Sequence, residues 1–138
     1  MTNPIYDTYK PPGFHTVSAY LTTNDAPPLI EFLKTAFHAV ELQRTVSPEG
    51  VIRNCIMQIG DSCYMVGRSF TGEPMPGQFY LYCEDPDALH ARAVQHGAES
   101  VMKVEDQNYG DRQGGVKDCA GNYWWISKRF LEEPYSSK

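Results

Sequence analysis

After the first 14 residues, apolar and polar positions follow regular spacings that predict a helix among strands. Residues 18–23 suit a strand, and the apolar residues between Leu29 and Phe37 then recur at the spacing of one helical face. Asn24-Asp25 stands where a helix cap is expected, with Pro27 close to the first helical position. Three strand-like runs, each separated from the next by turn-forming residues, follow at 41–46, 51–59 and 63–68.

The second half of the chain repeats this plan. A strand is expected at 78–83, and Asp85-Pro86 opens a helix that stops at Gly97. Further strand-like segments are expected around 100–104, 111–117 and 123–128. Identical residues relate the two halves at a constant offset of 60 positions: Tyr20 and Tyr80, Leu21 and Leu81, Asp25 and Asp85, and Leu29 and Leu89. The pattern predicts a duplicated βαβββ module and an α+β fold.

The duplication predicts one domain over residues 1–138 that contains two tandem modules. The modules are expected at 15–68 and 77–128, with a turn-rich arm at 1–14 and a tail at 129–138. A single module would leave one face of its sheet uncovered and would not be stable alone. Two modules side by side are expected to form a curved mixed sheet, with helices on the outside and a cleft on the inner face.

The net charge of the chain argues against two classes of binding partner, nucleic acids and anionic membranes. The 138 residues carry 12 Lys and Arg against 17 Asp and Glu, which gives a net charge of −5. This balance argues against general nucleic-acid binding and against docking on anionic membranes, since both need a basic footprint. No apolar run approaches the roughly 20 residues of a spanning helix, and the N-terminus lacks the pattern of a signal peptide. We therefore expect a cytoplasmic protein.

The reactive residue types form no recognisable catalytic motif. The four cysteines have neither a Cys-x-x-Cys pair nor a His at zinc-finger spacing, and we interpret them as buried small hydrophobic residues. The four histidines are expected near the first strand or on the outer faces of helices. Ser18 has no recognisable His and Asp partners, so a hydrolytic triad is not supported.

Four segments resemble the vicinal oxygen chelate superfamily, which includes glyoxalase I, bleomycin-resistance proteins and extradiol dioxygenases. They are residues 30–39, 59–62, 109–112 and 118–126. The last resembles the DPFGN-x-W signature of the family and departs from it as Asp118-Cys119-Ala120-Gly121-Asn122. The likeness runs from about His15 to Lys128 and is strongest to the PhnB-like branch. It implies the glyoxalase/bleomycin-resistance fold and a homodimer.

Enzymes of this superfamily bind a divalent metal through His, Gln and Glu side chains on the first and last strand of each module. The resemblance places these positions at Ser18, Tyr64, Gln78 and Trp125. Trp cannot ligate a metal, and Ser and neutral Tyr are poor ligands. Because a catalytic metal needs about three protein donors, we expect no metal and no cofactor. The alternative is a metal-dependent lyase, isomerase or dioxygenase that uses Gln78 and residues outside this alignment.

Alternation along the strands places an aromatic set on the predicted cleft face. Aromatic rings offer stacking and cation–π attraction, and their hydroxyls offer hydrogen bonds, so this lining suits an aromatic or cationic organic ligand. Arg112 either binds a ligand carboxylate or pairs with Asp111 or Asp118 to hold its turn. The expected ligand-binding residues are Ser18, Tyr20, Tyr64, Gln78, Tyr80, Tyr82, Arg112, Tyr123 and Trp125.

Two interpretations of this lining remain open. In the leading hypothesis the chain is a metal-independent small-molecule-binding protein of the bleomycin-resistance type. In the other, the aromatic residues pack the cleft shut, and the chain is an interaction or regulatory domain. Each buried Tyr hydroxyl needs a hydrogen-bond partner, which counts against a filled cleft.

Overall fold

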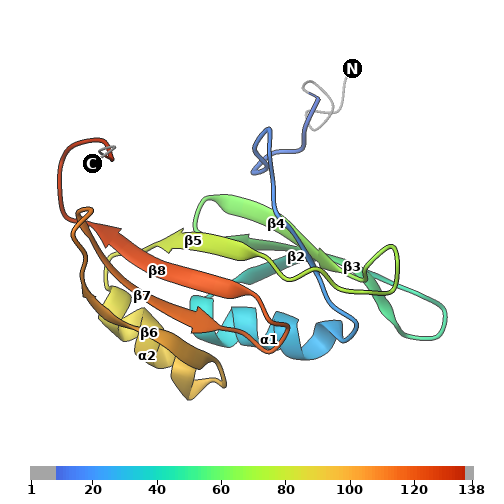
Figure 1. Cartoon of the computed structure of the whole chain (residues 1–138). Coiled ribbons are helices and arrows are strands. Elements are labelled where there is room, and N and C mark those ends of the chain that lie inside the picture. The colour runs from blue at the N-terminus through green and yellow to red at the C-terminus, as the bar shows by residue number, and fades with distance from the viewer. Residues whose placement is uncertain (1–8, 136–138) are drawn as a thin grey trace.

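The computed structural model of the chain describes residues 9–135 (Figure 1). Residues 1–8 of the predicted arm and 136–138 of the predicted tail lie outside this range. The first module consists of β1 (Tyr20–Thr22), α1 (Ala26–Phe37), β2 (Val40–Val46), β3 (Ile52–Ile59) and β4 (Ser62–Gly67). The second consists of β5 (Gln78–Tyr82), α2 (Pro86–Gln95), β6 (Glu99–Asp106), β7 (Asp111–Lys117) and β8 (Tyr123–Arg129). The predicted α+β class and the duplicated βαβββ order are confirmed.

Each module forms its own four-stranded mixed sheet. The order of strands is β1-β4-β3-β2 in the first sheet and β5-β8-β7-β6 in the second. In both sheets the first strand pairs in parallel with the fourth, and the other pairs are antiparallel. Strands β1 and β5 are therefore equivalent edge strands, and the seam between the two modules runs along them.

Proline and backbone conformation set the ends of the helices. Pro27 and Pro86 occupy the first turns of α1 and α2, where a missing N–H costs little. The Asp85 carboxylate caps α2 by accepting a hydrogen bond from the Ala88 N–H at 3.1 Å, whereas the Asp25 side chain makes no such bond to α1. Helix α1 ends at Phe37 and is followed by His38, whose φ of 59° is the left-handed conformation that Gly adopts most easily.

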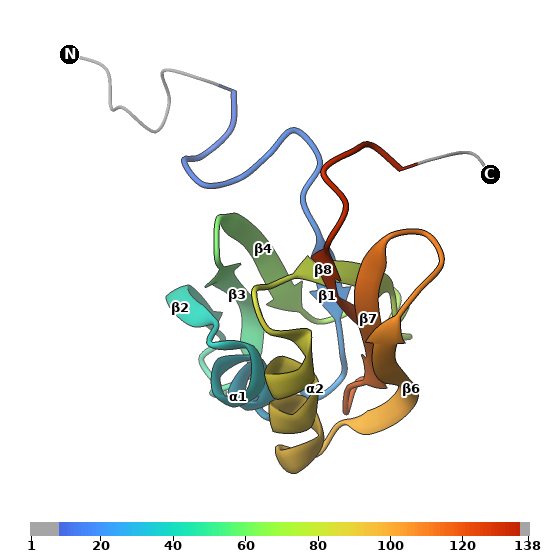
Figure 2. The ribbon, with the colours of Figure 1, turned by 90° about the vertical axis from the view of Figure 1, so that its left-hand side faces the viewer.

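Both helices lie on the same side of the two sheets and pack against each other (Figure 2). Arg92 of α2 donates a hydrogen bond to the backbone carbonyl of Thr35 in α1 at 2.5 Å, and Phe37 of α1 packs on Trp124 of β8. One apolar core therefore spans both modules. This arrangement differs from the expected one, because the helices fill the space under both sheets instead of lying outside a cleft. We call the opposite side of the two sheets, which faces away from the helices, the outer face.

The cysteines are only partly as predicted. Cys55 and Cys63 are buried, whereas Cys83 is half-buried and Cys119 is exposed. Burial raises the pKa of the Cys55 and Cys63 thiols, which keeps both neutral. In the described part of the chain, neither helix has the length and apolar character that crossing a membrane requires.

The segment that resembles the DPFGN-x-W signature fixes the turn between β7 and β8. The buried Asp118 carboxylate accepts hydrogen bonds from the backbone N–H groups of Ala120 and Asn122, at 2.8 and 3.0 Å. It also accepts a bond from the Trp124 indole at 2.8 Å. The Asn122 side-chain oxygen in turn accepts a bond from the backbone N–H of Gly77 at 2.9 Å. These bonds hold the beginnings of β5 and β8 together, so this segment has a structural role.

We expect Asp118→Ala to lower the free energy of unfolding by about 3 kcal/mol, because several buried donors lose their acceptor. Urea denaturation followed by circular dichroism measures the change. Asp61, in the exposed turn of the first module between β3 and β4, supplies the control. Asp61→Ala should change the stability by no more than about 0.5 kcal/mol. Equal stability of the Asp118→Ala variant and the wild type would contradict this role.

Candidate functional site

A pocket of about 330 Å³ lies at the seam between the two modules, where β1 approaches β5. Its wall is apolar and includes the buried residues Leu21, Leu81 and Trp124. Exposed polar residues contribute its rim, including the hydroxyl-bearing Ser18. The pocket thus combines an apolar wall with hydrogen-bonding groups at its opening, as small-molecule sites do.

Four of the nine predicted ligand-binding residues line this pocket: Ser18, Tyr64, Tyr80 and Tyr82. Tyr80 and Tyr82 are 54% and 57% exposed, and their rings stack with centroids 5.9 Å apart. The five that are not among its lining residues are Tyr20, Gln78, Arg112, Tyr123 and Trp125. Of the four residues in the pocket, Tyr80 and Tyr82 lie on the edge strand β5, Tyr64 lies on the inner strand β4, and Ser18 precedes β1.

The second module presents the predicted residues on its outer face. Phe79 of β5 and Trp124 of β8 pack together in the core, with ring centroids 4.9 Å apart, so the neighbours of each residue along its own strand point the other way. The parallel register aligns these residues in pairs: Gln78 with Tyr123, Tyr80 with Trp125, and Tyr82 with Ser127. The prediction that they share one face of the sheet is confirmed for this module.

Tyr64 lies on the helix side of the first sheet, so its predicted place on the cleft face is wrong. The ladder pairs it with Met57, which is fully buried. In the parallel ladders, Tyr20 pairs with Met65 in the first sheet and its repeat equivalent Tyr80 pairs with Trp125 in the second. The residue of the first module that is equivalent to Trp125 is therefore Met65, and not Tyr64. The sequence count failed because the first module has one residue more between its turn glycine and this strand position.

Tyr64 nevertheless lines the pocket, from its buried side. The side chain is 5% exposed, and its hydroxyl has no hydrogen-bond partner within residues 9–135. Burial, with a smaller contribution from Cys55, raises the pKa of this phenol far above its ordinary value, so it stays neutral. A buried hydroxyl without a partner destabilises the fold by its desolvation cost.

Arg112 holds β7 to α2 and takes neither of its two predicted roles. Its Nε and Nη2 atoms donate to the two carboxylate oxygens of Asp87, at 2.6 and 2.8 Å. Its Nη1 atom donates to Asp106 at 3.0 Å. The hydrogen bond from Arg112 lowers the pKa of the Asp87 carboxyl. With its donors engaged in this way, Arg112 stands apart from the pocket.

The residues at the metal-ligand positions of the superfamily do not fit a divalent metal. With the register of β4 corrected, these positions are Ser18, Met65, Gln78 and Trp125. The Trp125 indole N–H donates to the Gln78 side-chain oxygen at 3.0 Å, so the best donor atom of the set is already engaged. Met is a soft, weak ligand, and Trp has no lone pair to offer. Within residues 9–135, no group of three His, Cys, Asp or Glu side chains could hold a metal ion.

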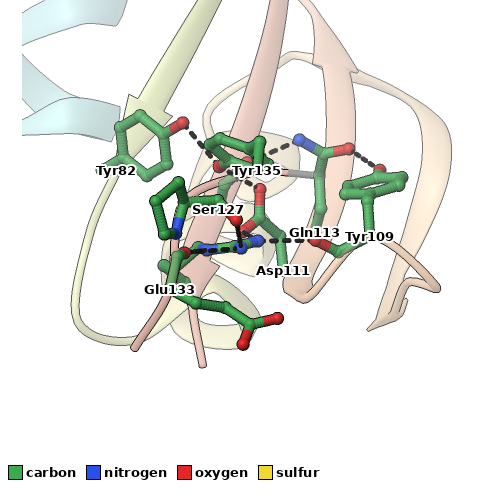
Figure 3. A network of polar contacts seen from close by, with 9 residues as sticks. Tyr82, Tyr109, Asp111, Gln113, Ser127, Glu133 and Tyr135 are labelled. Atoms are coloured by element: carbon green, nitrogen blue, oxygen red, sulfur yellow. Dashed lines mark hydrogen bonds and ion pairs between the residues drawn. The ribbon is translucent and has the colours of Figure 1, made fainter. Parts of the chain in front are cut away.

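A polar cluster that sequence reasoning missed lies on the outer face of the second sheet (Figure 3). Asp111, Gln113 and Ser127 are at most 3% exposed. Gln113 donates to the Ser127 hydroxyl at 2.6 Å, and the Tyr109 hydroxyl donates to the side-chain oxygen of Gln113. Alternating polar residues at 111 and 113 on a predicted strand were the one available signal for this cluster.

The chain beyond β8 completes this cluster. The Tyr135 hydroxyl donates to Asp111 Oδ2 at 2.6 Å and lies 2.7 Å from the Tyr82 hydroxyl. Arg129 donates to Asp111 Oδ1 at 3.3 Å and places its guanidinium 4.1 Å from the centroid of the Tyr135 ring. Partial burial, then the bonds to Asp111 and Tyr82, raises the pKa of the Tyr135 phenol. Tyr82 therefore touches both the pocket and this cluster.

Searches among known proteins found relatives in sequence and in structure. No model of a protein family matches the chain. Uncharacterized protein Mb0911c of Mycobacterium bovis is 34% identical over 128 residues, covering 84% of each chain. Uncharacterized protein Rv0887c of Mycobacterium tuberculosis has the same identity over 128 residues, covering 84% of this chain and 75% of that protein.

Solved structures share the fold at lower identity. TioX from Micromonospora sp. ML1 has a TM-score of 0.69 at 23% identity, over 87% of this chain and all of TioX. A member of the glyoxalase/bleomycin resistance protein/dioxygenase superfamily from Sphaerobacter thermophilus has a TM-score of 0.69 at 15% identity, over 83% and 97% of the two chains. A PhnB protein from Bacillus cereus has a TM-score of 0.66 at 12% identity, over 83% and 99%.

We expect Tyr64→Phe to raise the free energy of unfolding by about 1 kcal/mol, since it removes an unpaired buried hydroxyl and keeps the ring. Thermal and urea denaturation measure the change. Tyr82→Phe is the matched control, because the Tyr82 hydroxyl is hydrogen-bonded and its loss should not stabilise the protein. A Tyr64→Phe variant less stable than the wild type would show that the hydroxyl is satisfied in the folded protein.

Proposed function

The chain belongs to the family of the mycobacterial proteins Mb0911c and Rv0887c and has the fold of the glyoxalase/bleomycin resistance protein/dioxygenase superfamily, and from this premise we propose that it binds a small aromatic molecule between its modules. The binding site is the pocket at the seam of β1 and β5. Binding requires no metal. The protein thus acts as a small-molecule-binding member of its superfamily.

The single observation that carries this proposal is the combination of volume and lining in the pocket. About 330 Å³ lies within the range of roughly 300–1,000 Å³ that small-molecule sites occupy. The wall offers Trp124 and Phe79 beside aliphatic side chains, while the half-exposed Tyr80 and Tyr82 present rings and hydroxyls at the opening. Asp61 on the rim also accommodates a ligand with a positive charge.

Metal independence rests on the chemistry of the residues at the ligand positions. A hydroxyl, a thioether, an engaged amide and an indole are together too weak to hold a divalent cation in competition with water. This donor set supports the binding hypothesis over the metal-dependent lyase, isomerase or dioxygenase.

The homodimer implied by the family resemblance stays a prediction. Tyr20 is 51% exposed on the outer face of the first sheet, and Tyr80 is similarly exposed on the second. Exposed aromatic residues of this kind are compatible with a second copy of the chain over the outer face.

We expect thioflavin T, a planar aromatic cation, to bind the protein with an increase in dye fluorescence. Tyr80→Ala should weaken binding about three- to tenfold, because one stacking surface is lost. Ser18→Trp should block binding by filling the pocket from its rim. Fluorescence titration measures the dissociation constant.

Phe70→Ala is the matched control for this titration. Phe70 is fully exposed and is not among the residues that line the pocket, so its loss should leave dye affinity unchanged. Dye affinities that are equal for the wild type and Ser18→Trp would place binding elsewhere and contradict the proposal, as would the absence of any dye binding.

We expect the purified, untagged protein to retain far less than one metal ion per chain after exposure to Ni²⁺, Zn²⁺, Mn²⁺ and Fe²⁺. Elemental analysis after gel filtration measures the ratio. Dye affinity should also be unchanged by a chelator. Retention of about one ion per chain would overturn metal independence and favour the enzyme alternative.

A further inference from the structure

The chain after β8 turns back over the outer face of the second module (Figure 3). Arg129 holds this turn by donating to the backbone carbonyls of Glu133 and Pro134, at 2.9 and 3.2 Å. The turn delivers the Tyr135 ring to the buried Asp111, and the Glu133 side chain points away from the cluster. The single side chain that the segment 130–135 inserts into the polar cluster is therefore a phenol.

The hydrogen bonds around Tyr135 have a fixed direction. The Asp111 carboxylate, paired with Arg129, can only accept, so the Tyr135 hydroxyl donates to it. A hydroxyl has one proton, so the 2.7 Å contact with Tyr82 is a bond that Tyr82 donates. The recess over Asp111 therefore recognises a group that donates and accepts at the same atom, which is a hydroxyl.

The Arg129 guanidinium adds a requirement for the ring that carries this hydroxyl. It lies over the Tyr135 ring at 4.1 Å, where a neutral, electron-rich aromatic face is attractive and a cationic ring is repelled. The three groups Asp111, Tyr82 and Arg129 thus match one chemical class of occupant, a neutral hydroxyaryl ring.

Tyr135 and the segment that carries it bury little apolar surface over the recess. Tyr135 is 50% exposed, and the neighbouring Phe130 and Leu131 are 48% and 40% exposed. A segment with so little buried apolar surface opens at low cost in free energy. Because Tyr82 also lines the pocket at the seam, a ligand in the pocket lies next to the recess that Tyr135 fills.

We propose that the recess formed by Asp111, Tyr82 and Arg129 is a binding site for a neutral hydroxyaryl group, and that Tyr135 occupies it as a tethered competitor. This inference rests on the proposed function and names the chemical group that the ligand presents. A ligand that enters the pocket places its phenol where Tyr135 lay, and the segment 130–135 moves aside.

The test uses p-cresol, which reproduces the Tyr side chain, and full-length variants. If the docked segment predominates about ten to one, removing Tyr135 raises the apparent affinity about tenfold. We therefore expect isothermal titration calorimetry to show about tenfold tighter p-cresol binding to Tyr135→Ala than to the wild type. Glu133→Ala is the matched control, since its backbone carbonyl still accepts from Arg129, and it should bind p-cresol like the wild type.

Ligand analogues test the recognition of the hydroxyl. In Tyr135→Ala, 4-methylanisole accepts but cannot donate, and toluene does neither, so both should bind more weakly than p-cresol. Adding Tyr82→Phe to Tyr135→Ala removes one donor without disturbing the buried Asp111, and should reduce the preference for p-cresol over toluene.

Two results would overturn the inference: equal p-cresol affinity for the wild type and Tyr135→Ala, or toluene binding to Tyr135→Ala as tightly as p-cresol. Either result leaves the proposed function standing if thioflavin T still binds the wild type and is blocked by Ser18→Trp. Absence of thioflavin T binding would instead remove the proposed function itself.

Discussion

The rings of Phe37 in α1 and Trp124 in β8 lie with their centroids 5.1 Å apart, and this contact joins the two modules. Trp124 is held in place by its indole bond to the buried Asp118 and also packs on Phe79. One side chain of the first module's helix thereby packs against the sheet of the second module. The buried residues of both modules form a single apolar cluster, so the two modules share one core and stabilise each other.

The shared core decides which surfaces are left for binding. With both helices under the sheets, the inner side is filled, and the open surfaces are the outer face and the seam between β1 and β5. Trp124 is part of the core and also of the pocket wall. A ligand in the seam therefore contacts residues that hold the modules together, so binding is expected to stabilise the whole fold.

The two modules have diverged in how they use polar residues. In the second module, buried Asp118 and Asn122 order the turn before β8, and buried Asp111, Gln113 and Ser127 occupy the far end of the outer face. In the first module the corresponding turn is exposed at Asp61. The second module thus carries a buried polar network at its turn and a buried polar cluster on its outer face, whereas the corresponding turn of the first module is exposed.

Most of the fold was predictable from the sequence, because the spacing of apolar residues within each helix and strand is a local property. The repeat of Tyr20 and Leu21 as Tyr80 and Leu81 gave the modules, and alternation placed Gln78, Tyr80 and Trp125 correctly on one face. The alternation of side chains along a strand gives the correct face only if the position of one residue is known. One additional residue after the turn at Gly60 shifts the count by one position, and for this reason Tyr64 was assigned to the wrong face.

Other features were decided only by the tertiary structure, since they depend on residues far apart in sequence. Arg112 meets Asp87 across 25 positions, and Tyr135 meets Tyr82 across 53. The sequence alone determined an α+β duplication with aromatic edge strands. The packing of α1 on α2 decided that the helices lie beneath the sheets and the pocket at their seam, because the burial of apolar surface is a property of the whole molecule.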